Sequence, residues 1–296
     1  MSTGFNIPQF DTFIAMDWSG ATGRYNGIAV AICKTGRSAP QLVEPRGARF
    51  WTRESIAAWL EDQLDRGGRY LVGFDFAFGF PFETKLGYLG GRAPGVDRIF
   101  SLWSLIESQS CDDPDFGCAR FIANPAYEDL FWKSGTRPAN WIERKRRTEY
   151  ACAEKTGTRP DTLYKLLHSK QVGKASITGM HVLHQVRSRK ADHVAIWPFE
   201  TVRRSAIVEI YPTMFRKIAS GSIAKLKSAA ELNKALANIG SRPFPNGGRR
   251  PVSDHETDAV ISAAGLRWTA SNPEVWTNQE LRSRIVKREG WIFGVV

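Results

Sequence analysis

Aspartates follow two apolar segments of the chain, and their placement suggests a shared site. Asp17 comes directly after the run TFIAM, and Asp75 comes directly after the run YLVGF. Both runs have the length and composition of strands that are buried on both faces. Because ligands of open α/β sheets bind at the carboxyl ends of the strands, the two carboxylates form a candidate site at one sheet edge.

Two further acids lie on a helix that is predicted to begin after Ser253. The sequence SDHE predicts a capping box in which Ser253 is the N-cap and Glu256 is its partner. Asp254 and Asp258 are four residues apart and therefore project from one face of this helix. A neighbouring apolar stripe predicts that the helix packs on the sheet, which would bring four carboxylates together.

Such a cluster requires a cation, because two unit charges about 4 Å apart repel by about 4 kcal/mol at an effective dielectric constant of about 20. All-oxygen ligands favour Mg²⁺ or Mn²⁺, and a pair of such ions can promote phosphodiester hydrolysis without a covalent nucleophile. The alternatives are that strand-end aspartates cap turns and that Asp254 only complements the helix dipole. We expect metal to bind Asp17, Asp75, Asp254 and Asp258, and expect catalysis to depend on Asp17, Asp75 and Asp258.

Two other residues are weaker candidates for the same site. Glu209 interrupts the apolar segment AIVEI, where a charge is costly unless it is paired or bound to metal. His255 lies beside the helix acids and is suited to orienting water or a phosphate, although a surface histidine in a first helical turn is the commoner case.

The charge of the chain favours a polyanionic partner. Lys and Arg number 41 against 30 Asp and Glu, which gives a formal net charge of +11 and a pI of about 9.7. Trp132 and Trp141 flank the first basic cluster, as in surfaces that stack bases, whereas a simply solvated surface is the alternative. The residues expected to contact nucleic acid are Arg144, Lys145, Arg146, Arg147, Arg249 and Arg250.

The elements that must position these residues follow a recognisable order. Periodicity and turn residues predict a helix with Thr52 as its N-cap, ended by Gly67 and Gly68. Strands are predicted at 12–17, 27–32, weakly within 41–51, at 70–75, 194–197 and 206–210. The chain therefore reads as an α/β protein with a hairpin-type start and later parallel strands.

The segment 82–190 lacks strand patterns and contains short helical stretches, such as 98–107 and 177–186. We interpret it as a large, mainly helical insertion within a single domain spanning residues 1–296. No stretch approaches the roughly 18 apolar residues that span a bilayer, and the first residues do not resemble a signal peptide. We therefore expect a cytoplasmic protein with no membrane partner. The cysteines show no CxxC spacing, so we expect free thiols.

Four short motifs resemble a domain-of-unknown-function family of predicted nucleases in the ribonuclease H-like superfamily. They are FIAMDWSG, GFDFAFGFP, WPFE, and VEIYP followed by DHETDAV. The resemblance implies a mixed sheet with three antiparallel strands, then parallel strands, and helices on both faces. In the wider superfamily, which includes Holliday-junction resolvases, the equivalents of Asp17, Asp75 and Asp258 bind two magnesium ions, and Asp254 resembles a further C-terminal acid.

The resemblance implies a metal-dependent nuclease that acts on DNA or RNA by a two-metal-ion mechanism. One alternative is an ATP-dependent phosphotransferase of the sugar-kinase and actin-like type, with DWSGATG as its first phosphate loop. Asp75 is followed by FAFG, however, and not by a paired-glycine phosphate turn. The other alternative is a non-catalytic nucleic-acid-binding module, although a binder of polyanions gains nothing from a carboxylate cluster.

Overall fold

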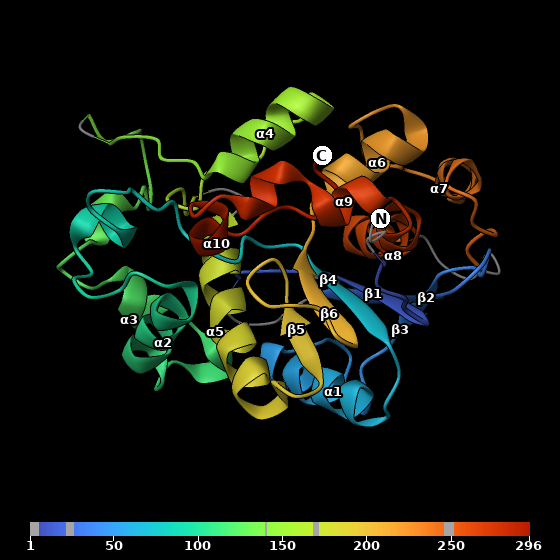
Figure 1. Cartoon of the computed structure of the whole chain (residues 1–296), viewed down its shortest axis with the longest axis horizontal. Helices are drawn as coiled ribbons and strands as arrows, with labels where there is room; N and C mark the ends of the chain where they lie inside the picture. Colours follow the sequence, from blue (N-terminus) through green and yellow to red (C-terminus); the bar gives the residue numbers. More distant parts are fainter. Residues whose placement is uncertain (1–5, 22–26, 140, 168–171, 246–251) are drawn as a thin grey trace, which may run out of the picture.

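A six-stranded mixed sheet forms the centre of the molecule (Figure 1). The computed structural model describes residues 6–21, 27–139, 141–167, 172–245 and 252–296. The strand order is β3-β2-β1-β4-β6-β5. The strands are β1 (Thr12–Asp17), β2 (Ala29–Lys34), β3 (Gln41–Val43), β4 (Tyr70–Phe74), β5 (Val194–Ile196) and β6 (Ser205–Glu209).

The pairing directions give this sheet a ribonuclease H-like topology, which confirms the expected fold class. β1, β2 and β3 are antiparallel to one another, whereas β4 is parallel to β1, and β6 is parallel to both β4 and β5. One feature was not predicted: β6 and not β5 pairs with β4, so the earlier strand β5 takes the outer edge.

Helices cover both faces of the sheet, as expected (Figure 1). On one face, α8 (Asp254–Ala270) packs on β1 and β2, and α6 (Pro212–Ser220) packs on α8. On the other face, α1 (Arg53–Asp65) lies beside α5 (Val172–Lys190), which also contacts β5. Alternate residues of β1 enter two hydrophobic clusters: Ile14 and Met16 face the side of α1, and Phe13 and Ala15 face the side of α8.

The predicted helix starts are confirmed by their hydrogen bonds. The Thr52 hydroxyl accepts from the Ser55 backbone N–H at 3.0 Å at the start of α1. At the start of α8, the Ser253 hydroxyl accepts from the Glu256 N–H at 3.2 Å, and the Glu256 carboxylate accepts from the Ser253 N–H at 2.8 Å. This capping box sets the register of α8 and hence the face from which Asp258 projects.

Short helices dominate the segment 82–190, and its described residues form only isolated β-bridges in place of strands. The last helix of the segment, α5, is longer than predicted and belongs to the layer that covers the sheet. The insertion boundaries and the single-domain organisation remain predictions. The other elements here are η1 (Tyr88–Gly91), α2 (Ile99–Ser110), η2 (Pro114–Phe116), α3 (Ala119–Ile122), η3 (Glu128–Leu130) and α4 (Arg147–Thr156).

Helices follow β6 along the chain, and one of them, α8, packs on the sheet. Within the described ranges, no helix has the length and apolar character needed to cross a membrane. The remaining helices are α7 (Ala229–Asn238), α9 (Pro273–Thr277), η4 (Gln279–Arg282) and α10 (Val286–Glu289).

Candidate functional site

Three aspartates come together where β1 and β4 end. Asp17 is the last residue of β1 and is 5% exposed. Asp75 directly follows β4, and its backbone N–H donates to the Met16 carbonyl at 3.0 Å, which continues the pairing with β1. Asp258, also buried, lies in the second turn of α8, the helix that packs on β1 and β2.

The electrostatics of the three carboxylates indicate that they repel one another. Burial raises the pKa of Asp17, and the Asp258 charge raises it further. The pKa of Asp75 is raised well above its usual range, first by burial and then by the charges of Asp17 and Asp258. Lys225 and Arg216 act in the opposite direction on the Asp75 pKa. The acids therefore form one interacting cluster, which we call the acidic cluster (Asp17, Asp75 and Asp258).

Two protein cations bind Asp258, one at each carboxylate oxygen. Arg216, on α6, donates to Oδ1 and also to the Thr213 hydroxyl at 2.8 Å. Lys225, on the segment between α6 and α7, donates from Nζ to Oδ2 at 2.5 Å. The Arg216 side chain is 5% exposed, whereas that of Lys225 is 43% exposed. The sequence analysis did not identify either residue.

His255 reaches the acidic cluster from the first turn of α8. Its Nδ1 lies 2.5 Å from Asp17 Oδ2, and its side chain is 48% exposed. The hydrogen bond with Asp17 raises the pKa of His255, which favours the charged imidazolium beside the carboxylate. The structure thus places the half-exposed His255 side chain against Asp17 at the acidic cluster.

Asp254 does not join the other three acids in this arrangement. It is exposed in the first turn of α8, although it is only four residues from the buried Asp258. The charges that most affect the pKa values of Asp17 and Asp75 come from the cluster itself and from His255, Lys225 and Arg216. Its exposed position in the first helical turn is one at which an acid complements the helix dipole.

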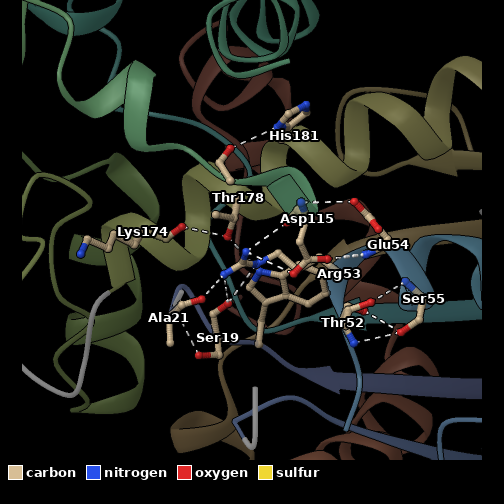
Figure 2. A network of polar contacts seen from close by, with 12 residues as sticks. Ser19, Ala21, Thr52, Arg53, Glu54, Ser55, Asp115, Lys174, Thr178 and His181 are labelled. Atoms are coloured by element: carbon tan, nitrogen blue, oxygen red, sulfur yellow. Dashed lines mark hydrogen bonds and ion pairs between the residues drawn. The ribbon is translucent and has the colours of Figure 1, made fainter. Parts of the chain in front are cut away.

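A buried arginine fixes the loop that follows Asp17 (Figure 2). Arg53, the first residue of α1, is fully buried and donates to the Ser19 carbonyl at 3.2 Å and to the Ala21 carbonyl at 2.5 Å. It also pairs with the Asp115 carboxylate at 3.6 Å. The Arg53 guanidinium therefore ties the loop to α1 and to the helical segment 82–190.

Close packing against α5 also holds the loop that follows Asp17. The Trp18 indole N–H donates to the Thr178 hydroxyl of α5 at 3.3 Å. A Cβ at Gly20 would lie 2.3 Å from the Ala175 backbone nitrogen, so only glycine fits there. In the described part of the loop, residues 18–21, two carbonyls point at Arg53 and the Ala21 N–H donates to the Ser19 hydroxyl, so these groups are not directed at a phosphate.

Glu209 belongs to a buried ion-pair network at the end of β6. Its Oε1 and Oε2 accept from Arg146 at 2.5 and 2.8 Å, and Oε2 also accepts from the Phe78 backbone N–H at 3.0 Å. Arg146 additionally donates to Glu149 Oε1 at 2.5 Å. Pairing with Arg146 is therefore what makes a charge in this strand tolerable.

This network corrects one prediction about the basic surface. Arg146 is 1% exposed and is fully engaged by Glu149 and Glu209, so the expectation that it contacts nucleic acid is wrong. In the basic run 144–147, only Arg146 lies in the core. Its guanidinium fills the space between the buried Glu149 and Glu209, which leaves no room there for a second one.

The other basic candidates have varied environments. Arg144 pairs with Glu83, Lys145 with Glu143, and Arg147 with Glu280, and the Arg147 side chain is the most exposed of the three cations at 54%. Trp132 and Trp141 pack against each other with ring centroids 5.5 Å apart. Contact of these residues with nucleic acid remains a prediction. Arg249 and Arg250 lie outside the described residues.

The donor chemistry of the acidic cluster fits a hard divalent cation, since all of its ligand atoms are carboxylate oxygens. The observed arrangement of these side chains, however, does not form a metal site. Among the residues that the structure describes, no three His, Cys, Asp or Glu side chains are arranged to hold one metal ion. Protein cations occupy Asp258, and His255 occupies Asp17. A metal ion would first have to displace the partly exposed partners, Lys225 and His255.

The fold and the site define an α/β protein with a ribonuclease H-like sheet and a buried acidic cluster at the carboxyl ends of two central strands. Comparison with known proteins adds no relative: no family model, no curated protein and no solved structure matches the chain.

Proposed function

We propose that this chain is a metal-dependent nuclease that hydrolyses phosphodiester bonds of DNA or RNA, with Mg²⁺ or Mn²⁺ bound by the acidic cluster. The observation that supports this best is the convergence of the buried Asp17 and Asp258 and the partly buried Asp75 where β1 and β4 end. Desolvation raises the pKa of Asp75 most, and the charges of the other two acids raise it further. A bound divalent cation would relieve that repulsion. The sheet topology supports the same class of enzyme.

The chain's own residues have distinct parts in this proposal. Asp17 and Asp75 are fixed at the ends of paired strands, and Asp258 is fixed on a docked helix, so their spacing is rigid. A bound metal would supply Lewis-acid stabilisation of charge on the phosphate. His255 holds a proton next to Asp17 and is exposed enough to reach a substrate oxygen or a water. Asp254 would be an outer, water-accessible ligand.

A groove beside His255 offers space for the chain that flanks the cleaved bond. Its lining includes Leu42 of β3, the partly buried Phe50, the exposed Arg49 and His255 itself. The buried Trp51 forms its floor, and the acids Glu44 and Glu256 also line it. Aromatic and arginine side chains are suited to stacking bases and holding phosphates. The formal net charge of +11 favours the same polyanionic substrate.

The test is digestion of labelled single-stranded, duplex and branched DNA and RNA in Mg²⁺, Mn²⁺ or chelator. We expect metal-dependent cleavage by the wild type that is lost in Asp75→Asn and kept in Asp62→Asn, a control at an exposed position on α1. A substrate that wild type and Asp75→Asn cut at the same rate would contradict the catalytic assignment.

A non-catalytic nucleic-acid-binding module is the second candidate. It is favoured by the pairing of Asp258 with Arg216 and Lys225, which balances that acid without metal. In the same experiment, such a module would bind the labelled strands without cutting any of them in either metal.

A further inference from the structure

Lys225 is the most easily displaced cation at the acidic cluster. It lies between the end of α6 at Ser220 and the start of α7 at Ala229, and its neighbour Leu226 is buried and anchors the segment. The Nζ–Oδ2 distance to Asp258 is 2.5 Å, yet 43% of the Lys225 side chain is exposed. An ion pair with one solvated partner is weak, so this contact can break at small cost.

Arg216 differs from Lys225 although both bind the same carboxylate. Its buried guanidinium is held by Asp258 and by the Thr213 hydroxyl. Leaving that position would strand a charge in the protein interior, which is strongly unfavourable. Asp258 therefore has one fixed counter-ion and one exchangeable counter-ion.

The Lys225 amine also acts on the cluster as a whole. Its charge lowers the pKa of Asp17, of Asp75 and of His255, so its field reaches both strand ends and the first turn of α8. These are the effects that a bound cation would have at this position. In the arrangement observed, the Lys225 ammonium occupies the Asp258 oxygen that a divalent cation would need.

We propose that Lys225 and a divalent metal ion compete for Asp258, and that the displaced amine then binds a phosphate of the substrate. The proposal rests on the metal site of the proposed function. When a metal ion takes Oδ2, the long lysine side chain is free to turn toward solvent. Lys225 already lines a pocket between α6 and α7, together with Ser222, Lys227, Lys234 and Glu231, so its amine can turn into that pocket without moving the backbone. An ammonium group among other lysines is suited to holding a phosphate as a point charge.

The first test is calorimetric titration of the metal-free full chain with Mn²⁺ alone. Lys225→Met removes the competitor, so we expect Mn²⁺ to bind roughly fivefold more tightly than to wild type. Lys85→Met is the control, because it removes an exposed lysine charge outside both the acidic cluster and the lysine pocket, and its Mn²⁺ affinity should stay within about twofold. Equal shifts in the two variants, or weaker Mn²⁺ binding by Lys225→Met, would overturn the proposal. Circular dichroism melting verifies that both variants fold.

The second test is fluorescence anisotropy with a short labelled single strand, in Ca²⁺ or in chelator, with the intact length of the strand checked on a gel. Lys225→Met should weaken binding by roughly threefold to tenfold in Ca²⁺, with a salt slope less steep by about 0.7, and should change nothing in chelator. An equal loss in both conditions would mean that the amine is not released by metal.

The outcomes also separate this proposal from the proposed function. Competition in the calorimeter without cleavage of any substrate would contradict the nuclease and leave the exchange of Lys225 standing. Metal-dependent cleavage with identical Mn²⁺ affinities for wild type and Lys225→Met would support the nuclease and contradict the exchange of Lys225.

Discussion

The three carboxylates of the acidic cluster differ in how their charges are balanced. Asp258 has two cationic partners and Asp17 has His255, whereas the described residues provide Asp75 with no side-chain hydrogen bond. The pKa of Asp75 is raised first by desolvation and then by the repulsion of the other two acids. Replacement of Asp75 and of Asp258 should therefore have opposite effects on stability.

In chelator at about pH 8, we expect Asp75→Asn to raise the free energy of unfolding by about 1 kcal/mol, because it removes a partly buried charge that two neighbouring carboxylates repel. Asp258→Asn should lower it by about 2 to 4 kcal/mol, because the buried Arg216 loses its counter-ion. Urea unfolding of both variants, with Asp62→Asn as control, measures the difference. Destabilisation by Asp75→Asn as large as that by Asp258→Asn would argue against a repulsive cluster.

At the scale of elements, periodicity and capping predicted most of the fold. The strands that carry Asp17 and Asp75 and the capping box at Ser253 depend on residues that are close in sequence, so local patterns determine them. The positions of Asp17 and Asp75 at one sheet edge followed from parallel strand pairing. The order of β5 and β6 in the sheet could not be predicted, because the order of strands along the chain does not decide which parallel strand lies at the edge of the sheet.

The polar partners of the site could not be predicted in this way. Arg216 and Lys225 lie 42 and 33 residues from Asp258, and no local pattern encodes such pairs. His255 was a candidate from its place beside the helix acids, but its contact with Asp17, 238 residues away, was not predictable. Arg146 had a usable signal: Glu209 within a buried strand requires a cation, which a nearby arginine run can supply. The arginine run was predicted to lie on the surface. Arg146 is buried instead, because it is the cation that Glu209 requires.

The junction of β1, α1 and η2 depends on Arg53. Arg53→Met would leave the Ser19 and Ala21 carbonyls and the Asp115 carboxylate without the guanidinium, so we expect a loss of about 3 kcal/mol in unfolding free energy. Arg66→Met, at an exposed position directly after the same helix, should cost less than about 0.5 kcal/mol. Urea unfolding measures both, and similar values for the two variants would contradict the role of Arg53.

At the scale of the whole molecule, several buried groups favour the protonated form in the folded state. Burial raises the pKa values of Asp17, Asp75 and Glu289, and it raises that of Glu149 to about 7. The hydrogen bond to Asp17 raises the pKa of His255 above its usual value. Four acids and histidines act in the opposite direction. Burial lowers the pKa values of His181 and His184, so stability from these two histidines rises with pH up to about 6.5. The hydrogen bonds of Asp129 and Glu280 with arginines lower their pKa values, but solvent screening makes these two contributions small.

These shifts fix the sign of the pH dependence of stability. A carboxyl group with a raised folded-state pKa binds its proton more tightly than in the unfolded chain, so stability falls as pH rises from about 4 through the folded-state pKa. His255 acts in the same direction, because the stability from its charged form is present below about 6.5 and is lost as pH rises through its folded-state pKa. We therefore expect the free energy of unfolding in chelator to be higher at about pH 5.5 than at about pH 8.

Glu149 is the group for which this expectation is most specific, since its pKa of about 7 lies between those two pH values and contrasts with an ordinary value of 4.5. Its contribution to the difference should be about 1 to 2 kcal/mol. In Glu149→Gln that contribution disappears, because glutamine does not titrate, while Arg146 keeps Glu209 as its counter-ion. The control Glu154→Gln changes an exposed residue of the same helix and should keep the wild-type pH dependence. Urea unfolding of the three proteins at both pH values measures the slopes. A wild-type stability that rises from pH 5.5 to pH 8, or an equal slope in Glu149→Gln, would show that the buried network does not hold its protons in this range.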